Sequence, residues 1–75
     1  MEKRLSDLAV GEKGKILKMK SRGEIGRRMS DMGIIKGTEI RVEKVAPLGD
    51  PIDILVMGYH LTLRVSEAKN ILVEV

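Results

Sequence analysis

The sequence of 75 residues contains no cysteine, no phenylalanine and no tryptophan. The absence of cysteine excludes disulfide bonds, cysteine-ligated zinc, iron–sulfur clusters and thiol catalysis. Without Phe and Trp, a hydrophobic core has to be built from Ile, Leu, Val, Met and Ala. The chain has one histidine and one tyrosine, which leaves little equipment for acid–base catalysis. We therefore expect that it is not an enzyme.

Long apolar runs are also missing. No segment approaches the roughly 20 apolar residues that span a bilayer. The first residues, MEKRLSDLAVGEKGK, carry charges but no apolar run of the length found in signal peptides. We expect neither export by such a signal nor insertion into a membrane, and the lack of cysteine is compatible with a reducing cytosol.

The length and composition fit one folded domain over residues 1–75. Hydrophobic residues make up 43% and charged residues 33%, as in ordinary globular domains. A domain of this size buries only about 60% of the surface that its unfolded chain exposes. A partner or weak self-association would therefore help to stabilise it.

Positive charge is concentrated in one part of the chain. The formal net charge is +3. Between residues 13 and 28 a single acid, Glu24, accompanies a series of basic residues: Lys13, Lys15, Lys18, Lys20, Arg22, Arg27 and Arg28. A basic face attracts nucleic acid, anionic lipid or an acidic protein surface. The alternative is a solvated strand face that carries lysines.

Short apolar segments separated by glycine-containing turns predict five strands, over residues 15–20, 38–46, 52–57, 60–65 and 71–75. Gly37 is predicted to take a positive φ at a turn. Gly58 and Tyr59 have the Gly-X pattern of a two-residue type II′ hairpin, and Ser66 is predicted to cap a single helical turn. Since closure removes exposed strand edges, we predict a mainly β, small five-stranded barrel with one inserted helix and short one-turn helices.

The inserted helix is predicted over about residues 22–32. Ile25, Met29 and Met32 repeat at i, i+4 and i+7 and form one apolar stripe. Ser21 and Glu24 have the spacing of a capping box. Gly33 follows at the position where a helix commonly ends in a left-handed residue.

Residues 47–64 hold the only histidine and two nearby acids, Asp50 and Asp53. Asp53 and His60 are predicted to be cross-strand neighbours, so contact between them is possible. They are the candidates for a metal site, but non-haem iron sites use two histidines and a carboxylate. We assign no metal ligand, and the competing interpretation of His60 is a half-exposed strand residue.

Four segments resemble the ferrous iron transport protein A (FeoA) family in joint order and spacing, over nearly the whole chain. They are LSDLAVGEKGKI, RRMSDMGIIKGTEI, APLGDPIDILVMGYHLTLR and SEAKNILVEV. The resemblance implies an SH3-like β-barrel in the cytoplasm. It also implies a role beside the membrane GTPase permease FeoB, which moves Fe(II), and a loose association with transition metals; we expect no cofactor.

The resemblance therefore implies a cytosolic, non-enzymatic accessory or regulatory protein of ferrous iron uptake. It would dock on the cytoplasmic GTPase part of a FeoB-like permease, and so be recruited to the inner face of the membrane. The predicted contact surface combines the helix, neighbouring basic residues and a loop tip: Leu48, Arg22, Ile25, Arg27, Arg28, Met29, Met32 and Tyr59. Core packing is the competing explanation for at least two of the three apolar helix residues.

The alternative function is a basic small-barrel module that binds nucleic acid. The segment GEIG, residues 23–26, resembles the GXXG loop of KH domains and is flanked by Arg22, Arg27 and Arg28. The strand order around it does not match that fold, however. Tyr59 is the only aromatic side chain, whereas single-strand binders stack bases on several. We therefore expect no nucleic-acid partner.

Overall fold

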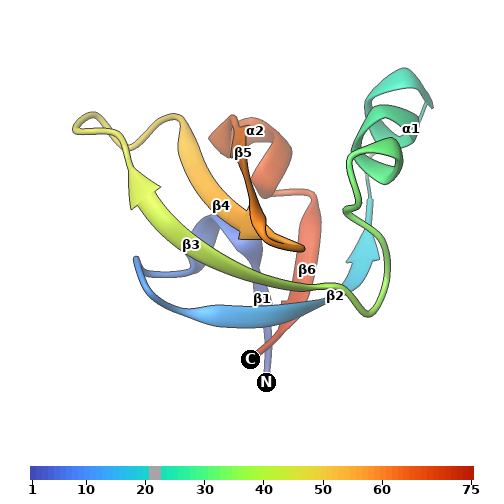
Figure 1. Cartoon of the computed structure of the whole chain (residues 1–75), viewed down its shortest axis with the longest axis horizontal. Helices are drawn as coiled ribbons and strands as arrows, with labels where there is room; N and C mark the ends of the chain where they lie inside the picture. Colours follow the sequence, from blue (N-terminus) through green and yellow to red (C-terminus); the bar gives the residue numbers. More distant parts are fainter. Residues whose placement is uncertain (21–22) are drawn as a thin grey trace.

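The computed structural model describes residues 1–20 and 23–75, which form one antiparallel sheet with short helices around it (Figure 1). The strands are β1 (Glu2–Arg4), β2 (Lys13–Met19), β3 (Glu39–Val45), β4 (Ile52–Val56), β5 (Tyr59–Leu63) and β6 (Ile71–Glu74). The helices in the described residues are the 3₁₀ turn η1 (Leu5–Asp7), α1 (Gly23–Asp31) and α2 (Val65–Ala68). The predicted mainly β fold is confirmed.

The prediction of five strands was one strand too few. The missed strand β1 pairs with β6, with Glu2 opposite Glu74 and Arg4 opposite Leu72. The sheet has the order β1-β6-β2-β3-β4-β5, so within the described residues β1 and β5 each have one edge without a neighbouring strand. The sheet curls strongly, but its hydrogen bonding does not close as the predicted barrel would require (Figure 1).

Side-chain interactions hold the short β1 in place. The Lys3 ammonium lies 3.2 Å from the Glu12 carboxylate, which also accepts the Ala9 N–H at 3.0 Å. The hydrogen bond from Ala9, followed by the interaction with Lys3, lowers the pKa of Glu12 from its ordinary value. Glu12 thus ties β1 to the turn that leads into β2.

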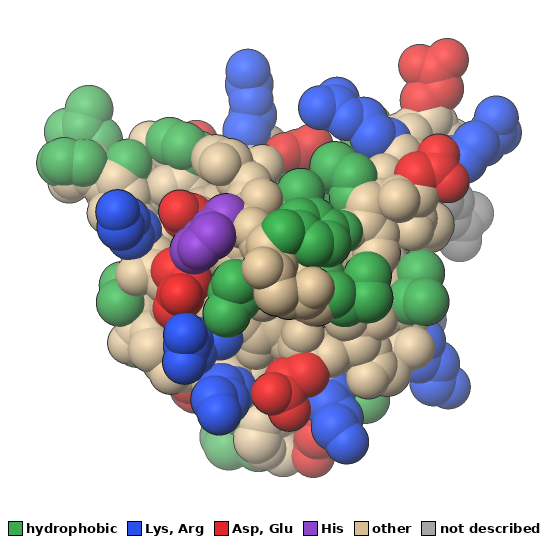
Figure 2. Space-filling view, in the orientation of Figure 1, with side chains coloured by type: hydrophobic (Ala, Val, Ile, Leu, Met, Phe, Trp, Pro, Cys, Tyr) green, Lys and Arg blue, Asp and Glu red, His purple; other side chains and the backbone are tan. Residues whose placement is uncertain are grey.

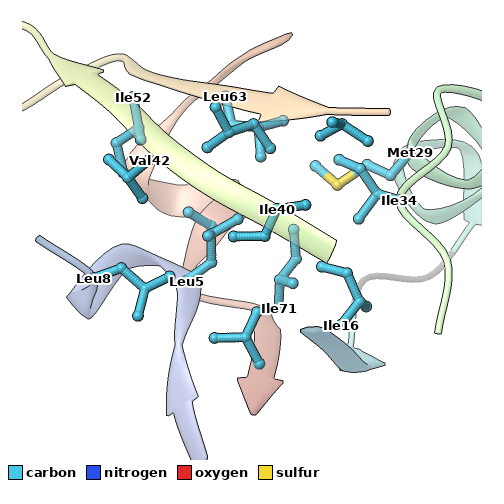
Figure 3. Packing of buried hydrophobic residues seen from close by; sticks show 14 residues of the cluster. Leu5, Leu8, Ile16, Met29, Ile34, Ile40, Val42, Ile52, Leu63 and Ile71 are labelled. Carbon is cyan, nitrogen blue, oxygen red and sulfur yellow. The ribbon is translucent and has the colours of Figure 1, made fainter. Parts of the chain in front are cut away.

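Alternation along the strands builds the core. In β4, Ile52, Ile54 and Val56 are buried, whereas Asp53 and Leu55 lie on the other face. The complete buried cluster is Leu5, Leu8, Ile16, Met29, Ile34, Ile40, Val42, Ile52, Ile54, Val56, Leu63, Ala68, Ile71 and Val73. Figure 3 shows Met29 and Ile34 entering this core from the side of α1. No polar residue is fully buried in the part of the chain that the structure describes.

The end of α1 agrees with its predicted cap. Gly33 has a φ of +93° and follows the helix. Its N–H donates to the Ser30 carbonyl, and the Ile34 N–H donates to the Met29 carbonyl. These two bonds form a Schellman motif, which stops the helix and turns Ile34 into the core. The predicted capping box at the other end involves Ser21, which lies outside the described residues.

The hairpin turn between β4 and β5 lies one residue earlier than predicted. Val56 and Tyr59 are paired, so Met57 and Gly58 form the two-residue turn. Both have positive φ, +48° and +85°, as a type I′ turn requires and a type II′ turn does not. The prediction placed glycine first because Gly-X and X-Gly turns look alike in sequence. The positive φ predicted for Gly37 is confirmed at +91°.

The cap predicted for α2 was also wrong. The helix begins at Val65, so Ser66 lies inside its first turn. The Val65 N–H donates to the Asp50 carboxylate at 3.0 Å, and the Arg64 N–H donates to the Glu67 carboxylate at 2.9 Å. An acid from the β3–β4 loop therefore caps the helix, and local sequence gives no sign of it.

Candidate docking groove between α1 and β5

The β4–β5 hairpin contacts the end of α1. The Tyr59 hydroxyl donates a hydrogen bond to the Met32 carbonyl. A Cβ built on Gly33 would lie 2.5 Å from the Met57 methyl carbon and 3.0 Å from the Tyr59 hydroxyl oxygen. The hairpin tip therefore packs against the capped end of the helix, where only a glycine leaves enough room.

A groove of about 600 Å³ lies between α1, the end of β5 and the start of α2, and we call it the α1–β5 groove. Its lining residues are Ile25, Arg28, Pro51, Thr62, Leu63, Arg64, Ser66 and Glu67. In Figure 1, α1 and α2 lie at the end of the molecule opposite the two termini. The elements that line the groove therefore lie far from the chain ends.

The chemistry of the groove combines an apolar wall with positive charge. Ile25 is 52% exposed and Leu63 is buried at the floor. Arg28 and Arg64 are exposed, and neither forms an ion pair with a carboxylate among the described residues. The carboxylate of Glu67 accepts the Arg64 N–H. This arrangement suits a partner that brings an apolar side chain together with carboxylates.

The structure separates the helix residues that the sequence grouped together. Ile25 and Arg28 line the groove, whereas Arg27 is exposed but is not among the lining residues. Met29 is only 1% exposed and belongs to the core, so it offers no surface to a partner. Met32 is half-buried against the core. Arg22 lies outside the described residues.

The loop tip and the helix do not form one continuous surface. Leu48 is 97% exposed, in agreement with its placement at a loop tip. Its loop and α1 lie at opposite ends of the longest axis, which measures 30 Å (Figure 1). Tyr59 is 40% exposed and lies on the side of α1. The residues predicted to form a single contact surface therefore lie on two separate surfaces, one at the β3–β4 loop with Leu48 and one at α1.

Asp53 and His60 do meet, as predicted. The His60 Nδ1 lies 3.1 Å from the Asp53 Oδ1, and the histidine side chain is 59% exposed. Asp50, the other acid of this segment, instead accepts a hydrogen bond from the Val65 N–H. Within residues 1–20 and 23–75, no three His, Cys, Asp or Glu side chains come together as a metal site. The pair fits a half-exposed strand contact.

The basic run along β2 is interleaved with acids. Lys15 has Glu39 of β3 and Glu74 of β6 as its cross-strand partners. Figure 2 shows blue and red side chains mixed over the lower half of the visible face. Opposite charges at neighbouring strand positions compensate each other, so these lysines correspond to a solvated strand face more than to a nucleic-acid-binding surface.

Sequence reasoning missed Pro51, Thr62 and Arg64 as groove residues. Pairing between β4 and β5 brings Pro51 next to the end of β5, and α1 approaches from a distant part of the sequence. One sequence pattern could have identified two of these residues. Apolar and polar residues alternate in Leu-Thr-Leu-Arg, residues 61–64, and this alternation predicts that Thr62 and Arg64 lie on the outward face of the strand.

Three comparisons relate the chain to known proteins. A family model described as the FeoA domain matches residues 3–75. A Fe(2+) transport protein A/Fe(2+) transporter FeoB fusion protein of Porphyromonas gingivalis is 38% identical over 71 residues. That match covers 95% of this chain and 8% of the fusion protein, so the chain spans a small part of that relative.

Two solved structures are similar over nearly the whole chain. A FeoA-like protein from Clostridium acetobutylicum has a TM-score of 0.89 and 44% identity, covering 99% of this chain and 86% of that one. FeoA from Stenotrophomonas maltophilia has a TM-score of 0.82 and 30% identity, covering 93% of this chain and 87% of that one. It is described as a prokaryotic SH3 domain protein complexed with zinc. The SH3-like fold is thereby confirmed.

Proposed function

Because the chain belongs to the FeoA domain family, we propose that it is a non-enzymatic accessory protein of ferrous iron transport that docks on the cytoplasmic GTPase part of a FeoB-like transporter. The observation that carries this proposal is the relative in which protein A and FeoB form one chain. Covalent linkage keeps two domains at high local concentration. Association through the domain's own surface would have the same effect without such a linkage.

The α1–β5 groove supports this proposal. Binding energy in protein interfaces comes from a few apolar anchors in concave sites, while charge steers the encounter. Ile25 offers an exposed apolar contact, and Arg28 and Arg64 supply the charge. No helix in the described residues is long and apolar enough to cross a membrane.

Regulation follows if docking distinguishes nucleotide states. A ligand shifts a two-state equilibrium only by the difference between its affinities for the two states. An accessory protein that bound the GTP state more tightly would favour that state at equilibrium, and one that preferred the GDP state would favour the GDP state. A regulatory role therefore requires the affinity to depend on the nucleotide.

The test is titration calorimetry of the chain against the soluble GTPase region of a FeoB transporter, with GDP and with a non-hydrolysable GTP analogue. We expect binding with a nucleotide-dependent Kd. Ile25→Asp should weaken it by about tenfold or more, a loss of about 1.4 kcal/mol. Ile35→Asp is the matched control, because Ile35 is also 52% exposed but does not line the groove.

A second variant, Leu48→Asp, tests the separate surface at the loop tip. A loss of affinity with this variant alone would move the contact from the groove to the β3–β4 loop. Absence of binding in both nucleotide states, to the GTPase region and to the full-length transporter in detergent, would overturn the proposed function.

A further inference from the structure

We propose that the partner contributes an extended, acidic segment that enters the α1–β5 groove and pairs with β5 as an additional strand. This inference rests on the proposed function and specifies the form of the contact. It starts from the open sheet, because β5 is an end strand whose outer edge has no strand partner in the described residues. Extended peptides commonly bind proteins by adding to such an edge.

The register identifies the backbone groups that are available. Val56 and Tyr59 close the hairpin over a two-residue turn, so Tyr59 and every second residue after it bond to β4. The residues between them, His60 and Thr62, direct their N–H and C=O groups away from β4. These four groups form a short hydrogen-bonding template, and Thr62 lies in the lining of the groove.

The other open edge is less suitable. β1 has only three residues, and they read Glu-Lys-Arg. Short, charged edge strands are a common protection against strand addition. β5 has five residues and borders a groove. The two edges thus differ in length and surroundings, and the structure favours β5 as the acceptor.

Charge and shape indicate what the added segment carries. Side chains of an extended strand point alternately to opposite faces. An apolar side chain directed at Ile25 would therefore alternate with residues that reach the rim, where Arg28 and Arg64 are exposed. Guanidinium groups bind carboxylates with paired hydrogen bonds. The lining contains one carboxylate among its described residues, that of Glu67, and it already accepts the Arg64 N–H.

A second copy of this chain fits the groove less well. Pairing β5 with β5 of another copy would bring two sets of Arg28 and Arg64 to the same edge. Like charges placed opposite each other across an interface are unfavourable. Charge complementarity therefore favours an acidic segment of the partner over self-pairing.

The first test measures amide hydrogen exchange of the wild-type chain, alone and with the GTPase region of the FeoB transporter. We expect the His60 and Thr62 amides to exchange at least about tenfold more slowly in the complex, since ordered hydrogen bonding limits exchange. Binding without protection of these two amides would refute strand addition and leave the proposed function standing. Absence of binding would refute both. Concentration-dependent protection without the partner would indicate self-pairing and overturn the inference.

Thr62→Pro provides a second test, because proline deletes the outward N–H and is tolerated on strand edges. We expect at least tenfold weaker binding for Thr62→Pro. Thr62→Val keeps the N–H and should stay within about twofold of the wild type. Arg28→Glu should weaken binding to a similar degree and reduce its dependence on salt. If Thr62→Pro is folded, as its amide spectrum would show, and binds like the wild type, the inference is wrong; if it unfolds, the exchange experiment decides.

Discussion

Gly33 satisfies two separate requirements at a single position. Its φ of +93° is in the left-handed region that side chains rarely adopt. The space where a Cβ would lie is also occupied, by the methyl carbon of Met57 and the hydroxyl of Tyr59. Gly37 has nearly the same φ, +91°, but nothing lies within 4 Å of its ideal Cβ position. A side chain at position 37 would therefore experience backbone strain alone, whereas a side chain at position 33 would experience both backbone strain and steric crowding.

We predict that Gly33→Ala lowers the free energy of unfolding by more than Gly37→Ala does. The left-handed conformation alone costs a residue with a side chain about 1–2 kcal/mol. The free energy of unfolding of Gly37→Ala should therefore be lower than that of the wild type by about this amount. Gly33→Ala should lose more, because Met57 and Tyr59 have to move. Urea denaturation of both variants measures the difference.

A double variant tests how much of the stability lost in Gly33→Ala comes from steric crowding. Met57→Ala removes the methyl carbon that lies closest to the Gly33 position. Combined with Gly33→Ala, it should give a smaller loss than the sum of the two single losses, as expected for residues in contact. Equal losses for Gly33→Ala and Gly37→Ala, or strict additivity with Met57→Ala, would contradict this account.

At the scale of elements, α2 depends on an acid that is distant in sequence. The Asp50 carboxylate accepts the N–H of Val65, the first residue of the helix. A negative group at this position also interacts favourably with the helix dipole. The β3–β4 loop and α2 are thus linked, next to the floor of the α1–β5 groove.

We predict that Asp50→Ala destabilises the domain by about 0.5–2 kcal/mol, the range for losing a helix cap. Asp50→Asn should retain most of this stability, because the amide oxygen can still accept the hydrogen bond. Urea denaturation gives the free energies, and the exchange rate of the Val65 amide reports the local effect. If Asp50→Ala and Asp50→Asn lowered the free energy of unfolding equally, the hydrogen bond to Val65 would not be the source of the stabilisation.

The sequence predicted those elements whose stability is local. The i, i+4, i+7 spacing and Gly33 identified α1 and its end, because both signals arise within a few turns of helix. β1 was missed because its three charged residues become a strand only by pairing with β6, at the other end of the chain. The α2 cap was missed for the same reason, since Asp50 lies 15 residues from Val65.

The candidate site was predictable in part. The stripe formed by Ile25, Met29 and Met32 is correct, but a stripe does not reveal how much of it the rest of the fold covers. The sheet covers Met29 and leaves Ile25 at 52% exposure. Arg64 became relevant only when the β4–β5 hairpin placed it opposite α1. Such long-range contacts cannot be read from local patterns.

At the scale of the whole molecule, the stability of the fold depends on one small hydrophobic core. Stabilities of about 0.05–0.15 kcal/mol per residue give about 4–11 kcal/mol for a chain of 75 residues. Ile54 is 0% exposed and lies in β4 between Val42 and Leu61, its partners on the adjacent strands. A cavity at this position affects both neighbouring strands.

We predict that Ile54→Ala lowers the free energy of unfolding by about 2–5 kcal/mol, which is a large fraction of the total. Its Tm should fall by at least about 8 °C, given about 4–8 °C per kcal/mol for a domain of this size. Ile54→Val removes one methylene group and should cost about 0.5–1.5 kcal/mol. Calorimetry of the two variants measures both values; a loss below about 1 kcal/mol for Ile54→Ala would show that the core relaxes around the cavity.

The pairing of β1 with β6 has a consequence for how the domain can be tethered. The Val75 N–H donates to the Met1 carbonyl, and the Met1 ammonium lies 2.8 Å from the Glu74 carboxylate. Both ends therefore leave the molecule at one point, on the side away from α1 and α2 (Figure 1). A linker attached at either end would start from the same place and reach equally far. The order of the two domains in a fusion would thus make little difference to where the linker starts, and in either order it would start on the side away from α1 and α2.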